Sequence, residues 1–190
     1  MPQFRARIAA PALTPEERVS LVRQASQLVD GFYAHLLQKR AMYAVEPSQR
    51  LRLLMHRLGE LSDATFHEEL ARIFVELRDL HTLYVRPRPY RGRIAALRIQ
   101  IEQYWDDDSP HWIASKVAPA VAADHPDLKG AEILHWNGSP MALAVARNAE
   151  REPGSNPAAR LARGLERMAF RPLKVSPPPD DDWVDLRYKV

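Results

Sequence analysis

The spacing of the apolar residues changes near the middle of the chain, and this change limits the fold more than any other feature. Before residues 86–93, apolar side chains recur every three or four positions, as they do on one face of a helix. After that segment, Leu97, Ile99 and Ile101 alternate with polar residues, a pattern typical of a half-buried strand. The sequence therefore predicts an α+β protein in which a helical part precedes a sheet.

Two prolines separate these parts. Pro87 and Pro89 make a continuous helix through this stretch unfavourable, because proline lacks the backbone N–H and restricts the residue before it. We predict an N-terminal helical domain at residues 1–88 and a small β-sheet domain with helices at residues 89–190. Since the last expected strand, 183–190, would lie at a sheet edge, we expect the second domain to be truncated at its C-terminal end.

Helix starts are marked in the first part. Thr14, Pro15 and Glu17 combine an N-cap hydroxyl, a proline in the first turn and a capping-box glutamate. A second helix is expected from Pro47 and a third with Asp63 as its cap. The expected apolar stripes of these three helices are Val22, Ala25, Val29, Phe32 and Leu36; Leu51, Leu54, Met55 and Leu58; and Phe66, Leu70, Ile73, Phe74 and Leu77.

In the second part, strands and helices are expected to alternate around one tight turn. The dipeptide Asn137-Gly138 favours a hairpin turn, because both residues tolerate positive φ. Ser155, Asn156 and Pro157 mark a helix start, with Leu161, Leu165 and Met168 as its apolar stripe. The other expected elements are strands at 112–117, 131–136 and 183–190 and a helix at 140–150.

Composition excludes several classes of protein. With 46% hydrophobic residues the chain is expected to be globular and soluble, and no apolar run approaches the ~18 residues of a membrane span. Residues 8–13 are too short for a secretory signal, so a cytoplasmic location is favoured unless a signal peptide was removed. The absence of cysteine removes disulfides and thiol nucleophiles. A homo-oligomer is compatible with the sequence.

The densest basic stretch contains four arginines but does not require a nucleic-acid partner. The net charge is only +3, so the chain has no strong overall attraction for phosphates. We interpret the stretch as a solvated linker between the two domains, and a nucleic-acid interface as the weaker alternative. The four residues are Arg86, Arg88, Arg91 and Arg93.

No metal or cofactor motif is present in the sequence. His67, Glu68 and Glu69 lack the second histidine one turn further on that would complete a zinc pair, and no glycine-rich phosphate loop occurs. No serine lies in a strand-turn-helix elbow beside a basic partner. We therefore expect no metal, no cofactor and no complete catalytic apparatus in this chain.

His81 is the one candidate catalytic residue. It follows the expected third helix and borders the domain boundary, where clefts commonly form. A structural role is the alternative, because a histidine at a helix C-terminus can bond carbonyls and favours the negative end of the dipole. Residue type and position alone favour the structural role. Asp79 would point to a different face of a helix and is not expected to orient His81.

Two segments resemble carboxy-terminal-processing, or tail-specific, serine peptidases of the tricorn-like branch. They are 77–84, read as LRDLHTLY, and 130–140, read as GAEILHWNGSP; residues 156–173 fit the same comparison. The resemblance implies a helical region followed by a PDZ-like domain. It further implies that His81 is a general base, and that a serine nucleophile lies in a following α/β domain.

We therefore expect the chain to be the front portion of a serine peptidase, which positions a peptide or protein chain terminus and is inactive without its C-terminal catalytic domain. The alternative is a stand-alone peptide-binding module without catalysis. In either case, a peptide is expected to add to the strand edge at Leu97, Arg98, Ile99 and Ile101. Arg98 would attract a terminal carboxylate or would simply face solvent; the sequence leaves both open.

Overall fold

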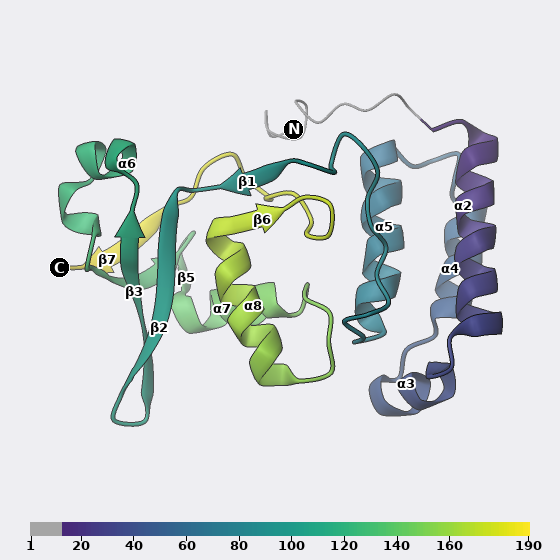
Figure 1. Cartoon of the computed structure of the whole chain (residues 1–190), viewed down its shortest axis with the longest axis horizontal. Helices are drawn as coiled ribbons and strands as arrows, with labels where there is room; N and C mark the ends of the chain where they lie inside the picture. The colour runs from purple at the N-terminus through teal and green to yellow at the C-terminus, as the bar shows by residue number, and fades with distance from the viewer. Residues whose placement is uncertain (1–12) are drawn as a thin grey trace.

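The computed structural model describes residues 13–190 and confirms the α+β class, with 46% of the residues in helices and 19% in strands. Residues 1–12, which hold most of the short apolar N-terminal run, lie outside the described residues. The N-terminal helices gather at one end of the molecule and the larger antiparallel sheet lies at the other (Figure 1).

The helical region, residues 13–76, contains four α-helices and one π-helical turn. They are α2 (Pro15–Gln27), η1 (Leu28–Phe32), α3 (Leu36–Tyr43), α4 (Pro47–His56) and α5 (Asp63–Glu76). The expected capping box is confirmed: the Thr14 hydroxyl accepts from the Glu17 amide, and the Glu17 carboxylate accepts from the Thr14 amide. The third predicted cap is wrong by one residue. Ser62 caps α5, whereas Asp63 accepts a hydrogen bond from the Leu13 amide at 2.8 Å.

One apolar core holds these helices together, and burying each large side chain contributes about 1.5–3 kcal/mol. Phe32, which was expected on the apolar stripe of the first helix, is instead 80% exposed. The π-helical turn is the reason, because its wider spacing rotates Phe32 away from the stripe. The core residues are Val22, Ala25, Val29, Leu36, Leu51, Leu54, Leu58, Phe66, Leu70, Ile73, Phe74 and Leu77.

The sheet region, residues 94–190, has two sheets and two main helices. Its strands are β1 (Ile94–Ala96), β2 (Ile99–Asp106), β3 (Ser109–Val117), β4 (Glu132–Trp136), β5 (Ser139–Pro140), β6 (Phe170–Pro172) and β7 (Leu186–Lys189). Its helices are α6 (Pro119–Asp124), η2 (Pro126–Leu128), α7 (Met141–Ala149) and α8 (Pro157–Ala169). Figure 1 shows α7 and α8 between the sheet and the helical region.

The larger sheet follows the order β2-β3-β4-β5, with β7 also paired to β4, and β1 pairs separately with β6. Asn137 and Gly138 have φ angles of 46° and 75°, so the expected tight turn is confirmed. Asn156 caps α8 as expected, but Leu161 on its stripe is 42% exposed. Leu165 and Met168 are buried and pack into the core of this region.

Residues 77–93, the connecting segment, are not a solvated linker throughout. Arg86 is 2% exposed, and its Nη1 donates to the carbonyls of Leu173 at 3.3 Å and Ser176 at 2.8 Å. Tyr84 binds Nδ1 of the buried His67 on α5 at 2.7 Å, which fixes the segment against the helical region. The connecting segment is thus hydrogen-bonded to the helical region through Tyr84 and to the sheet region through Arg86, and the division at residue 88 stays a prediction.

Candidate functional site

His81 lies in an extended turn directly after α5. The helix ends at Glu76, and Arg78 has a φ angle of 51°, in the left-handed region. This conformation turns the backbone out of the helix before Asp79. The expectation that Asp79 points away from His81 rested on a continuing helix and is therefore wrong.

Asp79 holds this turn with its carboxylate. Oδ1 accepts the His81 amide at 2.9 Å, and Oδ2 accepts the hydroxyls of Tyr33 at 2.8 Å and Thr82 at 3.2 Å. Burial alone would raise the pKa of Asp79, but these three hydrogen bonds and the charge of Lys39 outweigh it and place the pKa below its ordinary value. The carboxylate is therefore ionised at neutral pH, and it ties the turn to the helical region through Tyr33.

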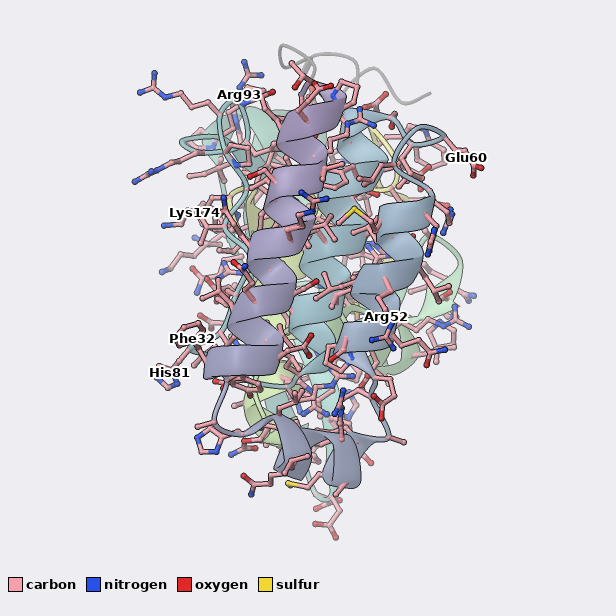
Figure 2. All side chains as sticks on the ribbon, turned by 90° about the vertical axis from the view of Figure 1, so that its right-hand side faces the viewer. Phe32, Arg52, Glu60, His81, Arg93 and Lys174 are labelled. Carbon is pink, nitrogen blue, oxygen red and sulfur yellow. The ribbon has the colours of Figure 1, made fainter. Side chains whose placement is uncertain are left out.

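The imidazole of His81 is presented to solvent. Its side chain is 93% exposed, and Nδ1 lies 3.7 Å from Oδ1 of Asp79. In Figure 2 the side chain projects outward at the edge of the helical end, below Phe32. At 3.7 Å the two atoms are too far apart for a hydrogen bond. A histidine beside a fixed carboxylate can act as a base whose tautomer the carboxylate selects.

A hollow of about 620 Å³ adjoins His81 where the helical and sheet regions meet. Arg78 spans this junction, because its Nη1 donates to the carbonyls of Glu150 and Glu152, each at 3.2 Å, and it also pairs with the Glu150 carboxylate. Ser155 lines the same hollow. Within residues 13–190, however, no serine hydroxyl forms a hydrogen bond with His81.

A second concave surface lies between β2 and α8. β2 pairs with β3 on one side only, and a groove of about 790 Å³ separates its other edge from α8. Ile99 and Ile101, two of the four residues expected to bind peptide, line this groove. The groove is completed by Gln100, Glu102, Gln103, Ala162, Leu165, Glu166, Ala169 and Phe170.

The other two expected residues lie outside the groove lining. Leu97 and Arg98 join β1 to β2 and belong to neither strand. The Leu97 amide donates to the Ala169 carbonyl at 3.0 Å, and the exposed Arg98 has a φ angle of 59°. The strand predicted through 97–101 therefore begins at Ile99. Arg98 stands just before the start of β2.

Sequence reasoning missed Tyr33 and Asp79 as parts of the His81 site. Tyr33 is 46 positions from Asp79 in the chain, so their contact has no local signal. Asp79 carried one unused signal: an aspartate two residues before the histidine can accept its amide in a turn. In residues 13–190, no group of three or more histidine, aspartate or glutamate side chains could hold a metal ion, and no helix is long and apolar enough to cross a membrane.

Solved structures of CPAF share this fold. Mature CPAF complexed with lactacystin matches with a TM-score of 0.70 and 13% identity, over 93% of this chain and 32% of the CPAF chain. Mature CPAF alone gives 0.66 and 13% identity over 92% and 34%, and a mutant of CPAF gives 0.69 and 14% identity over 92% and 31%. CPAF is a serine protease whose fold resembles that of tail-specific proteases.

At this identity the similarity establishes the fold alone. The chain spans about a third of the length of the solved structures that it matches. Its sequence matches no protein-family model and no curated protein.

Proposed function

We propose that this chain is the substrate-positioning part of a serine peptidase, in which His81 is the general base for a serine supplied by another domain of the complete protein. One observation carries the proposal: an exposed histidine stands on a turn fixed by Asp79, in a fold shared with a serine protease over 93% of the chain. The tricorn-like branch and the PDZ-like nature of the sheet region are parts of this proposal.

The chemistry needs one proton acceptor and one orienting group. Neutral imidazole accepts the proton of the serine hydroxyl while the serine oxygen attacks the substrate carbonyl, and the imidazolium later gives that proton to the leaving amine. The Asp79 carboxylate, whose Oδ1 lies 3.7 Å from Nδ1, would orient the imidazole in the tautomer that leaves Nε2 free to accept the proton. Such catalytic hydrogen bonds often tighten only when substrate is bound.

The test is the His81→Ala variant of the complete protein. We expect the turnover number to fall about a hundredfold or more with KM nearly unchanged, because only the proton transfer is removed. His125→Ala, a change of another exposed histidine, is the matched control and should keep wild-type turnover. Wild-type turnover by a well-folded His81→Ala enzyme would overturn the assignment.

The chain alone should hydrolyse no peptide. Labelling of the isolated chain by a serine-directed inhibitor, or turnover of casein above buffer, would contradict the proposal that the nucleophile comes from elsewhere.

For substrate positioning, we propose that an extended peptide adds to the free edge of β2, which the groove beside α8 leaves accessible. Backbone pairing with the strand would give affinity, and the alternating positions of Ile99 and Ile101 would give side-chain selectivity. Arg98 would meet the peptide's terminal carboxylate. The same groove supports the alternative function, a peptide-binding module without catalysis.

Amide chemical-shift mapping of the isolated chain tests this groove. A hydrophobic peptide with a free C-terminus should shift the amides of β2 and α8, and the C-terminally amidated peptide should bind more weakly. Arg98→Gln should remove that difference, whereas Arg91→Gln, at another exposed arginine, should not. Shifts confined to the helical region would exclude the groove.

The burial of one of the four arginines weakens the case for a nucleic-acid interface at the basic stretch. Arg86 is buried and donates to two carbonyls, so it is not available to phosphates.

A further inference from the structure

A separate cavity of about 420 Å³ lies in the sheet region and is not used by the proposed peptidase function. Its walls come from β1, β6, α7 and the segment 179–184. It shares only Ala169 with the residues that line the β2 groove. The cavity therefore requires its own explanation.

A buried guanidinium lines this cavity. Arg171 is 9% exposed; its Nε donates to the Arg167 carbonyl at 2.7 Å, and its Nη2 donates to Oδ1 of Asn148 at 3.2 Å. Its Nη1 is buried and has no hydrogen-bond partner among the described residues. Burial, followed by repulsion from Arg151, lowers the pKa of Arg171. Arg171 also forms no ion pair within residues 13–190, so an anionic group of a ligand in the cavity would stabilise its charge.

The charges around the cavity are unevenly distributed. Arg171 lies in the wall, Arg147 is exposed at the rim and has no ion-pair partner in the described part of the chain, and Arg151 pairs with Asp180 at 2.8 Å. Asp181 is exposed and also lines the cavity. A ligand would thus meet one buried guanidinium, Arg171, and exposed groups of both signs nearer to solvent.

The remaining lining is largely apolar. Ile94, Met168, Trp136 and Trp183 contribute side chains to the cavity. A purely ionic ligand such as phosphate would leave these surfaces unused, whereas a ligand with an apolar body would cover them.

We propose that this cavity binds a small zwitterion with an apolar body, of the class of a short peptide or amino acid with both termini free. Its carboxylate pairs with Arg171 and Arg147, its apolar side chains contact the tryptophans and Met168, and its ammonium group faces Asp181. The carboxylate supplies the negative charge that the buried guanidinium lacks within the described residues.

Calorimetric titration of the intact chain with leucyl-leucine tests the proposal. We expect leucyl-leucinamide, which lacks the carboxylate, to bind about tenfold or more weakly, the size of effect typical for a lost charged hydrogen bond. N-acetyl-leucyl-leucine, which lacks the ammonium group, should lose less. Equal binding of the acid and the amide would overturn the proposal.

Three variants locate the site. Arg147→Gln, at an exposed position that should leave the fold intact, and Arg171→Gln should both weaken leucyl-leucine binding and spare the amide. Arg52→Gln, at an exposed arginine of α4 on the helical end (Figure 2), is the control and should bind as wild type. Unchanged binding by a folded Arg147→Gln chain would overturn the site.

Asp181→Asn tests the second contact. This substitution should weaken the binding of leucyl-leucine but not of N-acetyl-leucyl-leucine. Substitution and acetylation together should therefore reduce the affinity no more than either change alone. If Asp181→Asn weakens both ligands equally, the ammonium contact is wrong. Because none of these residues belongs to the His81 turn or the β2 groove, failure here leaves the peptidase proposal untouched.

Discussion

The helical region and the sheet region differ in the size of their cores and in the surfaces that they expose. The helical region encloses a single core of aliphatic and aromatic residues, and the turn that carries the exposed His81 follows it and is fixed to it through Asp79 and Tyr33. The sheet region has a smaller core and leaves concave surfaces: the edge of β2 beside α8, and the arginine-lined cavity.

The connecting segment determines whether these parts act as one. Arg78 and Arg86 donate from this segment to carbonyls of the sheet region, while Tyr84 and Asp79 bind His67 and Tyr33 of the helical region. We therefore expect the two regions to unfold together, although the sequence predicted two domains.

The largest effect should come from the cores. Leu70→Ala in the helical region and Ile133→Ala in the sheet region, both 1% exposed, should each lower the free energy of unfolding by about 3–5 kcal/mol through the cavity they create. All four tryptophans lie in the sheet region, so tryptophan fluorescence reports that region, whereas far-UV circular dichroism reports the helices of both regions, the larger share of which lies in the helical region. Leu70→Ala should shift both transitions; an unchanged fluorescence transition would show that the regions unfold separately.

The second-largest effect should be a loss of stability of the helical region at low pH. Burial lowers the pKa of His67 from its usual 6.5 to about 4, so the unfolded chain takes up this proton first as pH falls. The free energy of unfolding should be highest above pH 6.5 and fall by about 3 kcal/mol as pH drops to 4. Urea unfolding at several pH values measures this slope.

His67→Gln should remove that part of the slope, since glutamine can still pair with the Tyr84 hydroxyl but does not titrate. His125→Gln, at an exposed histidine, should leave the slope unchanged. If the free energy of unfolding depends on pH equally in His67→Gln and His125→Gln, a group other than His67 causes the acid sensitivity.

Removing the hydrogen bonds that Arg86 donates to the sheet region should lower the free energy of unfolding by less than a core substitution does. Arg86→Met leaves the carbonyls of Leu173 and Ser176 without their donor, and we expect a loss of about 2 kcal/mol. It should also separate the fluorescence and dichroism transitions. Arg88→Met, two residues away and exposed, should do neither. Coincident transitions in Arg86→Met would mean that other contacts couple the regions.

The helix caps should show the smallest effect and no difference between regions. Thr14 caps α2 through the Glu17 amide, and Asn156 caps α8 through the Ala158 amide at 2.9 Å. Alanine at either position should cost about 1 kcal/mol. Thermal unfolding of the two variants measures this, and a much larger loss for one of them would show that its cap also holds tertiary structure.

The sequence by itself determined the local features of this protein. The capping box at Thr14, the Asn137-Gly138 turn, the cap at Asn156 and the change from helical to strand spacing each depend on residues a few positions apart. Short-range hydrogen bonds and side-chain periodicity are encoded in such neighbours, so the α+β class could be predicted without coordinates.

Tertiary structure decided the rest, because the decisive contacts join distant residues. The sequence alone predicts a solvated linker arginine at Arg86, but in the structure the carbonyl of Ser176, 90 positions later, accepts a hydrogen bond from it. The sequence alone predicts Phe32 as a core residue, but the π-helical turn in the structure rotates its side chain to solvent. The sequence alone predicts Asp79 as a helix residue. In the structure the left-handed Arg78 leads the chain out of the helix, and the Asp79 carboxylate binds both the Tyr33 hydroxyl and the His81 amide. Long-range burial and one backbone φ angle, neither visible in local sequence, therefore place the candidate base.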